Sequence, residues 1–278
     1  MQIDLDAVTM AQVAGLRIRH HLISRELKGL LPVALPSEEF QRVLNIACGD
    51  GVWALDFARL YPKKHVIGID TRERLLQMAR ENARVSGLKN IRFEHFQLDI
   101  TLPYSDHRFD LIQTEQSTTT IFPYRWPDLL REQVRVLKPG GWIHLVAFEF
   151  GPTSSPAVNR FMQMLREAYA RLIHTEKSSK MYITAATLYA SMLHKAGCQH
   201  VEYQLFPMDL GNQYGTTGHD HLKYAILTHP AVTAFLILHN VAPQEDIEAL
   251  RHEALNEIEQ MDFCGAGMVI SAIGQKPY

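Results

Sequence analysis

The sequence predicts an α/β fold in which a doubly wound parallel sheet occupies the first half of the chain. Between residues 42 and 150, short apolar runs alternate with helical patterns, as in successive βαβ units. The first of these runs leads directly into a Gly-x-Gly turn and a helix, an arrangement typical of a ligand crevice at the carboxyl end of a strand. After residue 150, helical patterns dominate, and two strand-like runs interrupt them.

The elements of the first half follow from hydrophobic periodicity and turn residues. A helix with a loose apolar stripe is expected over 8–30, and Pro32 and Pro36 break its pattern. Trp53 lies in the first turn of a helix that has to pack on the sheet, so we expect it in the core. Further helices are expected over 52–61, 72–86 and 127–137, and buried strands over 42–47, 65–70, 91–96, 109–114 and 142–150.

The second half is expected to be mostly helical. Helical patterns cover 156–174, 184–196, 218–240 and 243–261. The last of them has Pro243 at its start, followed by acidic residues, which is a favourable helix beginning. The two strand-like runs lie at 200–207 and 266–274.

Composition and charge exclude several classes of protein. The chain has 278 residues, with 28 Lys or Arg against 30 Asp or Glu and a net charge of −2. No basic run indicates a nucleic-acid partner, and no apolar run is long enough for a membrane span. The N-terminus lacks the apolar core of a secretory signal, and the three cysteines are far apart without zinc-ligand spacing. We therefore expect a cytoplasmic protein with reduced thiols and no metal.

The segment VLNIACGDGVWALDFA (43–58) and two aspartates predict the ligand. Gly49 and Gly51 allow a ligand to approach the backbone, and the following helix start offers free N–H groups. Asp70 ends the second strand, where a carboxylate can accept hydrogen bonds from ribose hydroxyls. Asp99 follows the third strand and could accept an adenine amine, with Ile100 packed on the ring. These residues indicate an adenosine-containing ligand in one crevice.

The same motifs resemble those of class I S-adenosylmethionine-dependent methyltransferases. ACGDG, VIGID, FQLDI, FDLIQ and the LLREQVRVLKPGGWIHL segment are similar to that superfamily's motifs in order, through about residues 40–150. The closest likeness is to its small-molecule branch, of the quinone-biosynthesis and secondary-metabolism type. The resemblance implies one Rossmann-like domain over 1–278 with a seven-stranded, mostly parallel sheet whose last strand is antiparallel. It also implies a helical cover at 8–30, a cofactor-binding core at 40–150, and helical lid regions for substrate at 151–183 and 210–261, with strands six and seven at 200–207 and 266–274.

The resemblance also implies a set of residues around S-adenosylmethionine. They are Cys48, Gly49 and Gly51 at the methionine, Asp70 and Thr71 at the ribose, Asp99 and Ile100 at the adenine, and Thr114 and Gln116 near the sulfonium. The family usually carries an acid two residues before the first glycine, and here that position is Ala47. S-adenosylhomocysteine would be the product.

The function implied is transfer of a methyl group to O, N or C of a small, partly apolar acceptor. A general base is required only if the acceptor has a proton to lose, and the candidates are Glu115, His219 and His20. His219 and His221 diverge on a helix, so a joint metal site is not expected. A homo-oligomer is left open.

Three alternatives are considered. An NAD-dependent oxidoreductase would carry a third glycine, where this chain has Ala54. A nucleic-acid amino-methyltransferase would carry an Asn/Asp-Pro-Pro-aromatic motif after the fourth strand, and the segment here reads QTEQSTTTIFP. A cyclase-like enzyme or a regulator that binds S-adenosylmethionine without transferring its methyl group keeps the same motifs and stays open.

Overall fold

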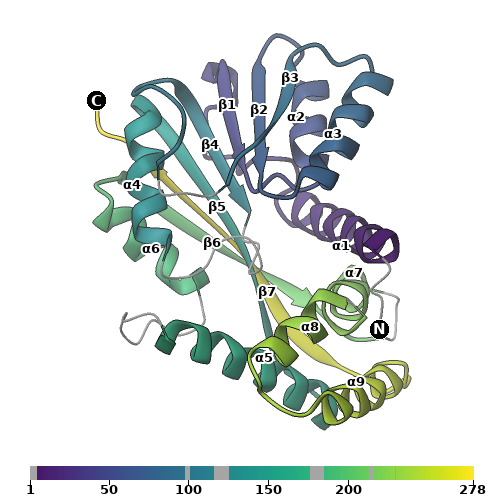
Figure 1. Ribbon diagram of the computed structural model, residues 1–278. Coiled ribbons are helices and arrows are strands. Elements are labelled where there is room, and N and C mark those ends of the chain that lie inside the picture. Colours follow the sequence, from purple (N-terminus) through teal and green to yellow (C-terminus); the bar gives the residue numbers. More distant parts are fainter. Residues whose placement is uncertain (1–4, 98–100, 116–124, 176–184, 213–215, 229) are drawn as a thin grey trace. The chain divides into compact units, whose positions relative to one another are not determined.

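The fold is one seven-stranded sheet with helices, seen in a computed structural model that describes residues 5–97, 101–115, 125–175, 185–212, 216–228 and 230–278. Within these residues the strand order is β3-β2-β1-β4-β5-β7-β6, mostly parallel with one antiparallel strand. Figure 1 shows β7, in yellow, between β5 and β6. The predicted fold class is confirmed. The strands are β1 (Arg42–Ile46), β2 (His65–Asp70), β3 (Ile91–His95), β4 (Phe109–Glu115), β5 (Leu137–Thr153), β6 (Gln199–Asp209) and β7 (Gly265–Gln275).

The helices of the described residues alternate with these strands along the first half of the chain and predominate in the second half. They are α1 (Leu5–Glu26), η1 (Ser37–Glu39), α2 (Val52–Leu60), α3 (Glu73–Val85), α4 (Trp126–Val136), α5 (Pro156–Thr175), α6 (Ala185–Lys195), α7 (Thr217–Asp220), the π-helix η3 (His221–Leu227), α8 (Pro230–Leu238) and α9 (Gln244–Ile258). The single helix expected over 218–240 is therefore divided. Pro230 begins α8, because proline lacks an N–H and fits the first turn of a helix but not its interior.

The strand register brings the carboxyl ends of three neighbouring strands to one edge of the sheet. β1 pairs in parallel with β2 and β4, and β2 pairs in parallel with β3. Ile46 at the end of β1 lies opposite Ile69 of β2 and Thr114 of β4. The ends of these strands therefore lie side by side, which is the position of ligand crevices in open α/β sheets.

The chain separates into two compact units, each described on its own. The core unit comprises Ile23–Phe148, Thr184–Leu205 and Val269–Tyr278, and the helical unit comprises Met1–Leu22, Glu149–Ile183 and Phe206–Met268. The division falls within β5, β6 and β7. Across the described ranges of both units, every helix is too short or too polar to span a lipid bilayer.

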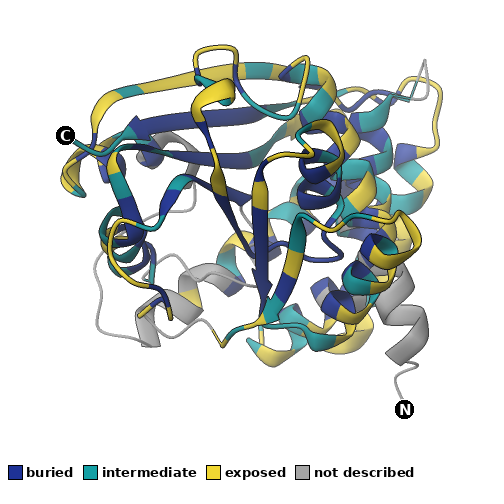
Figure 2. Cartoon of the chain, turned by 90° about the horizontal axis from the view of Figure 1, so that it is seen from above, coloured by how far each residue is buried: buried dark blue, intermediate teal, exposed yellow. Residues whose placement is uncertain are grey.

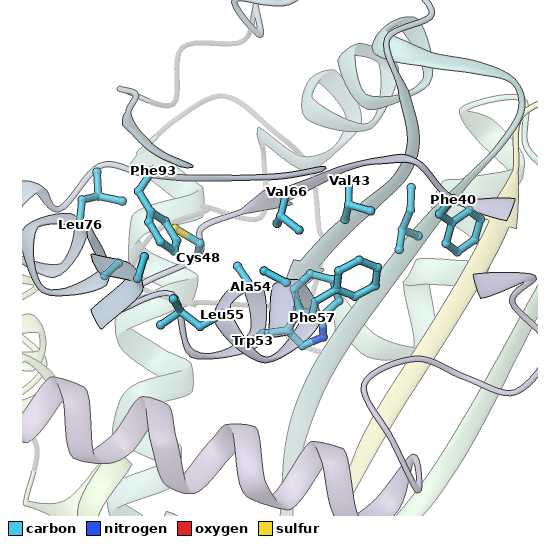
Figure 3. Close-up of a cluster of buried hydrophobic side chains, with 14 of the residues drawn as sticks. Phe40, Val43, Cys48, Trp53, Ala54, Leu55, Phe57, Val66, Leu76 and Phe93 are labelled. Atoms are coloured by element: carbon cyan, nitrogen blue, oxygen red, sulfur yellow. The ribbon is translucent and has the colours of Figure 1, made fainter. Parts of the chain in front are cut away.

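The core unit buries apolar side chains between α2, α3 and the sheet. Strands β1 and β4 are buried along most of their length, as apolar runs covered on both faces should be (Figure 2). Trp53 of α2 is buried as expected, stacks on Phe57 and donates its indole N–H to the Leu30 carbonyl oxygen at 3.1 Å. We call the apolar cluster around α2, which includes Phe40, Val43, Phe57, Val66 and Phe93, the core cluster (Figure 3).

The helical unit has its own packing. Helix α5 packs on α9 and α8, and α9 also contacts η3. Ser155 caps α5 by accepting a hydrogen bond from the Val158 N–H at 2.9 Å, and its hydroxyl donates to Glu257 of α9. Glu257 also accepts the Ala157 N–H at 3.2 Å. Glu257 of α9 thus accepts hydrogen bonds from the N-terminal end of α5, and these bonds hold the two helices together.

Candidate functional site

The turn between β1 and α2 has an unusual backbone. Ala47, Gly49 and Gly51 all have positive φ angles, of 57°, 60° and 78°. At Gly51 a Cβ would lie 2.5 Å from the ring of Phe93 and 2.9 Å from the Cβ of Ala79. Glycine is therefore required at Gly51 by both conformation and space. Ala47 adopts the left-handed conformation that glycine would take without steric cost.

Asp70 lies buried at the end of β2 and contacts this turn. Its carboxylate accepts the Gly49 N–H at 2.8 Å. It also accepts three hydrogen bonds from Arg72, from the backbone N–H, Nε and Nη2, each at 2.9 Å. Burial by itself would raise the pKa of Asp70, but the hydrogen bonds and charge of Arg72 outweigh it and hold that pKa below its usual value. Asp70 is therefore an ionised carboxylate in the core unit.

The neighbouring cysteine is a poor nucleophile. Cys48 is buried between Gly49 and β1, and its thiol pKa is raised well above the ordinary value, first by burial and then by the negative charge of Asp70. A protonated, buried thiol does not attack electrophiles at neutral pH. Cys48 can therefore contribute packing and backbone contacts to a ligand, and covalent chemistry is not expected of it.

The end of β4 completes the same edge of the sheet. Thr114 and Glu115 are both buried, and the Thr114 hydroxyl has no hydrogen-bond partner among the described residues. A buried hydroxyl without a partner is rare in folded proteins, so Thr114 is a candidate for contact with a ligand. Thr71, beside Asp70, is half-buried, and its carbonyl oxygen lies 3.0 Å from His95 Nε2. Asp99, Ile100 and Gln116 lie outside the described residues.

Two of the candidate bases, His20 and His219, belong to the helical unit, whereas Glu115 belongs to the core unit. His219 is buried, and its Nε2 lies 3.0 Å from the Ile258 carbonyl oxygen. Its backbone N–H donates to Thr216 at 3.2 Å, and its ring meets Phe263 edge to face. These contacts hold His219 within the packing of the helical unit. His20 is also buried.

His221 was expected to have no role in a metal site, and the structure shows it in a distinct environment. It begins the π-helix η3 and stacks on Phe150 with ring centroids 5.4 Å apart. Burial, followed by the positive charge of Arg19, lowers the pKa of His221 to about 3. It is therefore neutral at physiological pH. Among the described residues, no group of three His, Cys, Asp or Glu side chains is arranged to hold a metal ion.

A second set of buried polar side chains, which we call the polar row, crosses the core unit. Each member lies two positions along its strand from an apolar residue of the core cluster or packed against it, and residues two apart on a strand share a face. The members are Asn45, Gln113, His144 and Ser271, and all four are buried. Asn45 pairs in register with Gln113, and Gln113 pairs with His144. The Ser271 hydroxyl lies 2.9 Å from His144 Nε2.

Three side-chain atoms of the polar row have no hydrogen-bond partner among the described residues. They are Asn45 Oδ1, Gln113 Oε1 and His144 Nδ1. Burial lowers the pKa of His144 to about 3, so its ring is neutral. The sequence signal was one polar residue inside each of several apolar strand runs, but only the sheet order places these residues side by side. Arg72 was likewise missed, although it follows Asp70 by two residues.

Comparison with known proteins finds similarity to methyltransferases. The profile of a family described as a methyltransferase domain matches residues 43–141. A demethylmenaquinone methyltransferase of Listeria monocytogenes is 27% identical over 177 residues, covering 58% of this chain and 71% of the relative. The secondary metabolism regulator LaeA of Aspergillus fumigatus is 26% identical over 195 residues, covering 68% and 48%. Over residues 43–141 the chain is similar to methyltransferase domains, and this supports the class I S-adenosylmethionine-dependent methyltransferase class that its motifs resemble.

The fold agrees with this assignment. A solved geranyl diphosphate methyltransferase in complex with S-adenosylmethionine superimposes with a TM-score of 0.53 at 15% identity, covering 94% of this chain and 86% of that one. Of the two curated relatives above, the demethylmenaquinone methyltransferase is the one named for a small-molecule acceptor. The family assignment argues against the nicotinamide-dependent oxidoreductase.

Proposed function

We propose that the protein transfers a methyl group from S-adenosylmethionine to O, N or C of a small, partly apolar acceptor. The observation that carries this proposal is the edge formed by the turn at 47–51, the buried Asp70 and the Thr114 hydroxyl, which has no hydrogen-bond partner among the described residues. These residues bring a glycine turn, a carboxylate and a hydroxyl to one edge of the sheet, a combination suited to a zwitterionic nucleoside. The family match covers the same segment, at residues 43–141.

The proposed residue roles follow the order of the strands. Cys48, Gly49 and Gly51 would line the methionine part, where glycine permits close approach of the ligand. Asp70 and Thr71 would hold the ribose, and Thr114 with Gln116 would lie near the sulfonium. Asp99 and Ile100 are proposed for the adenine. This set gives each part of S-adenosylmethionine a partner of matching polarity.

Methyl transfer requires the protein mainly to bind and orient the two reactants. S-adenosylmethionine supplies a methyl group activated by its sulfonium charge, and the acceptor atom has to lie in line with the methyl–sulfur bond. The chain contributes a fixed cradle, excludes water and aligns the acceptor. A base is needed only for an acceptor that loses a proton, and Glu115, His20 and His219 remain the candidates for that role.

A partly apolar acceptor is supported by the relatives. Two of them are a demethylmenaquinone methyltransferase and a geranyl diphosphate methyltransferase, and both named compounds are small molecules with large apolar parts. We propose that the helical regions 151–183 and 210–261 contribute the acceptor site. Phe161 and Met164 in this region are buried, so they contribute to the packing of the helical unit.

A second candidate is a regulator that uses the same site without methyl transfer. The similarity to the secondary metabolism regulator LaeA favours it. The two functions share the nucleoside site and differ in product formation, so a binding measurement alone does not separate them.

The test has two stages. Calorimetry with S-adenosylmethionine and S-adenosylhomocysteine should show one binding site per chain, and Asp70→Asn should weaken it. Labelled S-adenosylmethionine is then supplied with phenolic, quinone and amine acceptors, and products are identified by mass spectrometry. Absence of binding to either compound at millimolar concentration would overturn the proposal, whereas binding without any labelled product would favour the regulator.

A further inference from the structure

The carboxylate of Asp70 has every hydrogen-bonding position filled by the protein itself. Oδ1 accepts from the backbone N–H and Nε of Arg72, and Oδ2 accepts from the Gly49 N–H and Arg72 Nη2. An ionised carboxylate has about four lone-pair positions. The Asp70 side chain is 0% exposed, so it has no contact with solvent that a ligand could replace. Any ligand that hydrogen-bonds to Asp70 has to displace one of these donors.

The four donors differ in how readily they can move. The Gly49 N–H belongs to the turn with positive φ angles, and the Arg72 N–H lies at the N-cap of α3, so both are fixed by the backbone. Nε and Nη2 belong to a long side chain that is 25% exposed and can turn towards solvent. The guanidinium is therefore the displaceable partner.

The guanidinium also imitates the shape of the expected ligand. It directs two parallel N–H donors at the two oxygens of one carboxylate. The vicinal diol of a ribose directs two neighbouring O–H donors in the same way. We propose that Arg72 occupies the ribose-binding face of Asp70 in the ligand-free protein and is displaced by the ribose diol. This inference rests on the proposed function, because it assumes that an adenosyl compound binds here.

The exchange has an energetic reason. A buried carboxylate without a partner is strongly unfavourable, so the ligand-free core unit needs a counter-charge at Asp70. Arg72, at the N-cap of α3, supplies this counter-charge and stabilises the ligand-free protein. The same contact weakens ligand binding, because the free energy of breaking it offsets part of the free energy gained from the hydrogen bonds of the ribose. Arg72 thereby acts as an internal competitor that sets the affinity for the nucleoside.

The experiment measures affinity and stability together, on the full chain. Arg72→Ala should tighten S-adenosylhomocysteine binding by roughly threefold to tenfold or more, because the ribose no longer has to displace the two guanidinium hydrogen bonds. The same variant should melt at a lower temperature without ligand, and S-adenosylhomocysteine should raise its melting temperature by more than it raises that of the wild type. Arg72→Lys, with a single ammonium that cannot span both oxygens, should fall between the two.

Matched variants keep the inference falsifiable. Arg84→Ala removes an exposed arginine of the same helix, paired with Glu81, and should change neither affinity nor ligand-induced stabilisation. In an Asp70→Asn background, the gain from Arg72→Ala should shrink, because the competition needs both partners. Equal or weaker binding by Arg72→Ala, with the wild type binding normally, would overturn the inference. Failure of the wild type itself to bind would instead overturn the proposed function.

A structure of the complex gives an independent readout. With S-adenosylhomocysteine bound, the ribose hydroxyls should lie within hydrogen-bonding distance of Asp70, and Nε and Nη2 of Arg72 should have left it. A complex in which Arg72 keeps both contacts would contradict the inference, whatever its affinity.

Discussion

Two regions of the core unit bury polar side chains and satisfy them in opposite ways. At the turn after β1, the Asp70 carboxylate has four donors, two of them backbone N–H groups. In the polar row, Asn45, Gln113 and His144 leave three atoms without a partner among the described residues. Both regions are almost fully buried, so solvent exposure does not explain the difference.

The difference comes from the backbone around each region. A turn and a helix start have N–H groups that no strand or helix uses, and these groups point at Asp70. Inside the sheet, the backbone groups of β1, β4 and β5 are already paired with neighbouring strands, so a polar side chain finds few donors there. Such a site is typically completed by buried water, which bonds to otherwise unsatisfied groups. The turn therefore supplies its own donors to a buried carboxylate, whereas the interior of the sheet leaves side-chain acceptors without one among the described residues.

The largest expected effect tests the geometry of the turn. Gly51→Ala should destabilise the fold by about 3 kcal/mol, because it adds the cost of a left-handed alanine to a clash with Phe93. Urea denaturation at pH 7 measures the change. Gly87→Ala is a matched control, since its φ of 66° is similar but no atom lies within 4 Å of the added Cβ. Equal losses for the two variants would mean that the close packing on Phe93 contributes nothing.

The next prediction concerns the exchangeable partner of the turn. Asp70→Ala should weaken S-adenosylhomocysteine binding by about 1–3 kcal/mol through lost charge-assisted hydrogen bonds. Calorimetry gives the affinity. Asp56→Ala, which removes a surface aspartate paired with Arg59, controls for the loss of one negative charge. An unchanged affinity for Asp70→Ala would count against the ribose assignment and against the role given to Arg72.

The polar row should make the fold sensitive to acid. The pKa of His144 is about 3 in the folded protein and about 6.5 in the unfolded chain, so only the unfolded chain binds a proton as pH falls between these values. The stability from a neutral His144 is complete above pH 6.5 and is lost towards pH 3, by about 2 kcal/mol between pH 7 and pH 5. The buried His221 adds a loss of the same sign.

Denaturation curves of wild type and His144→Gln at pH 7 and pH 5 measure this effect. The variant should lose less stability on acidification than the wild type does. His252→Gln, on the exposed side of α9, serves as the control for removing one imidazole. Parallel losses in wild type and His144→Gln would show that the polar row is open to protons in the folded state.

The smallest expected effect returns to the turn. Ala47 has a φ of 57°, which glycine adopts without the Cβ penalty. Ala47→Gly should raise the free energy of unfolding by about 0.5–1 kcal/mol, since relief of the left-handed alanine exceeds the extra chain entropy of glycine. Thermal melting measures the change. A loss of stability would indicate that Ala47 relaxes out of this conformation in solution.

The sequence was sufficient for features that depend on local pattern. Gly49, Gly51 and Asp70 could be placed because a buried strand, a glycine turn and an acid at the next strand end define one edge of a parallel sheet. The fold class and the family followed from the same segment. Contacts between side chains far apart in the sequence, or set by a side-chain conformation, could not be predicted. The hold of Arg72 on Asp70 depends on a side-chain conformation, and the polar row depends on the order of β1, β4, β5 and β7 in the sheet.

The helical unit shows the same limit. The sequence made His219 a candidate base, and the structure places its ring nitrogen 3.0 Å from the Ile258 carbonyl oxygen, 39 residues away. Periodicity predicts that a helix exists, but it does not predict which carbonyl of another helix remains unpaired. The candidate bases therefore stay predictions.

The three cysteines differ enough to give the protein a native labelling site. Cys48 and Cys198 are buried with raised thiol pKa values, whereas Cys264 is exposed. A maleimide dye at neutral pH should therefore attach at Cys264 alone, in the helical unit. A second dye on one cysteine introduced into the surface of the core unit would report the separation of the two units by energy transfer, without removal of any natural thiol.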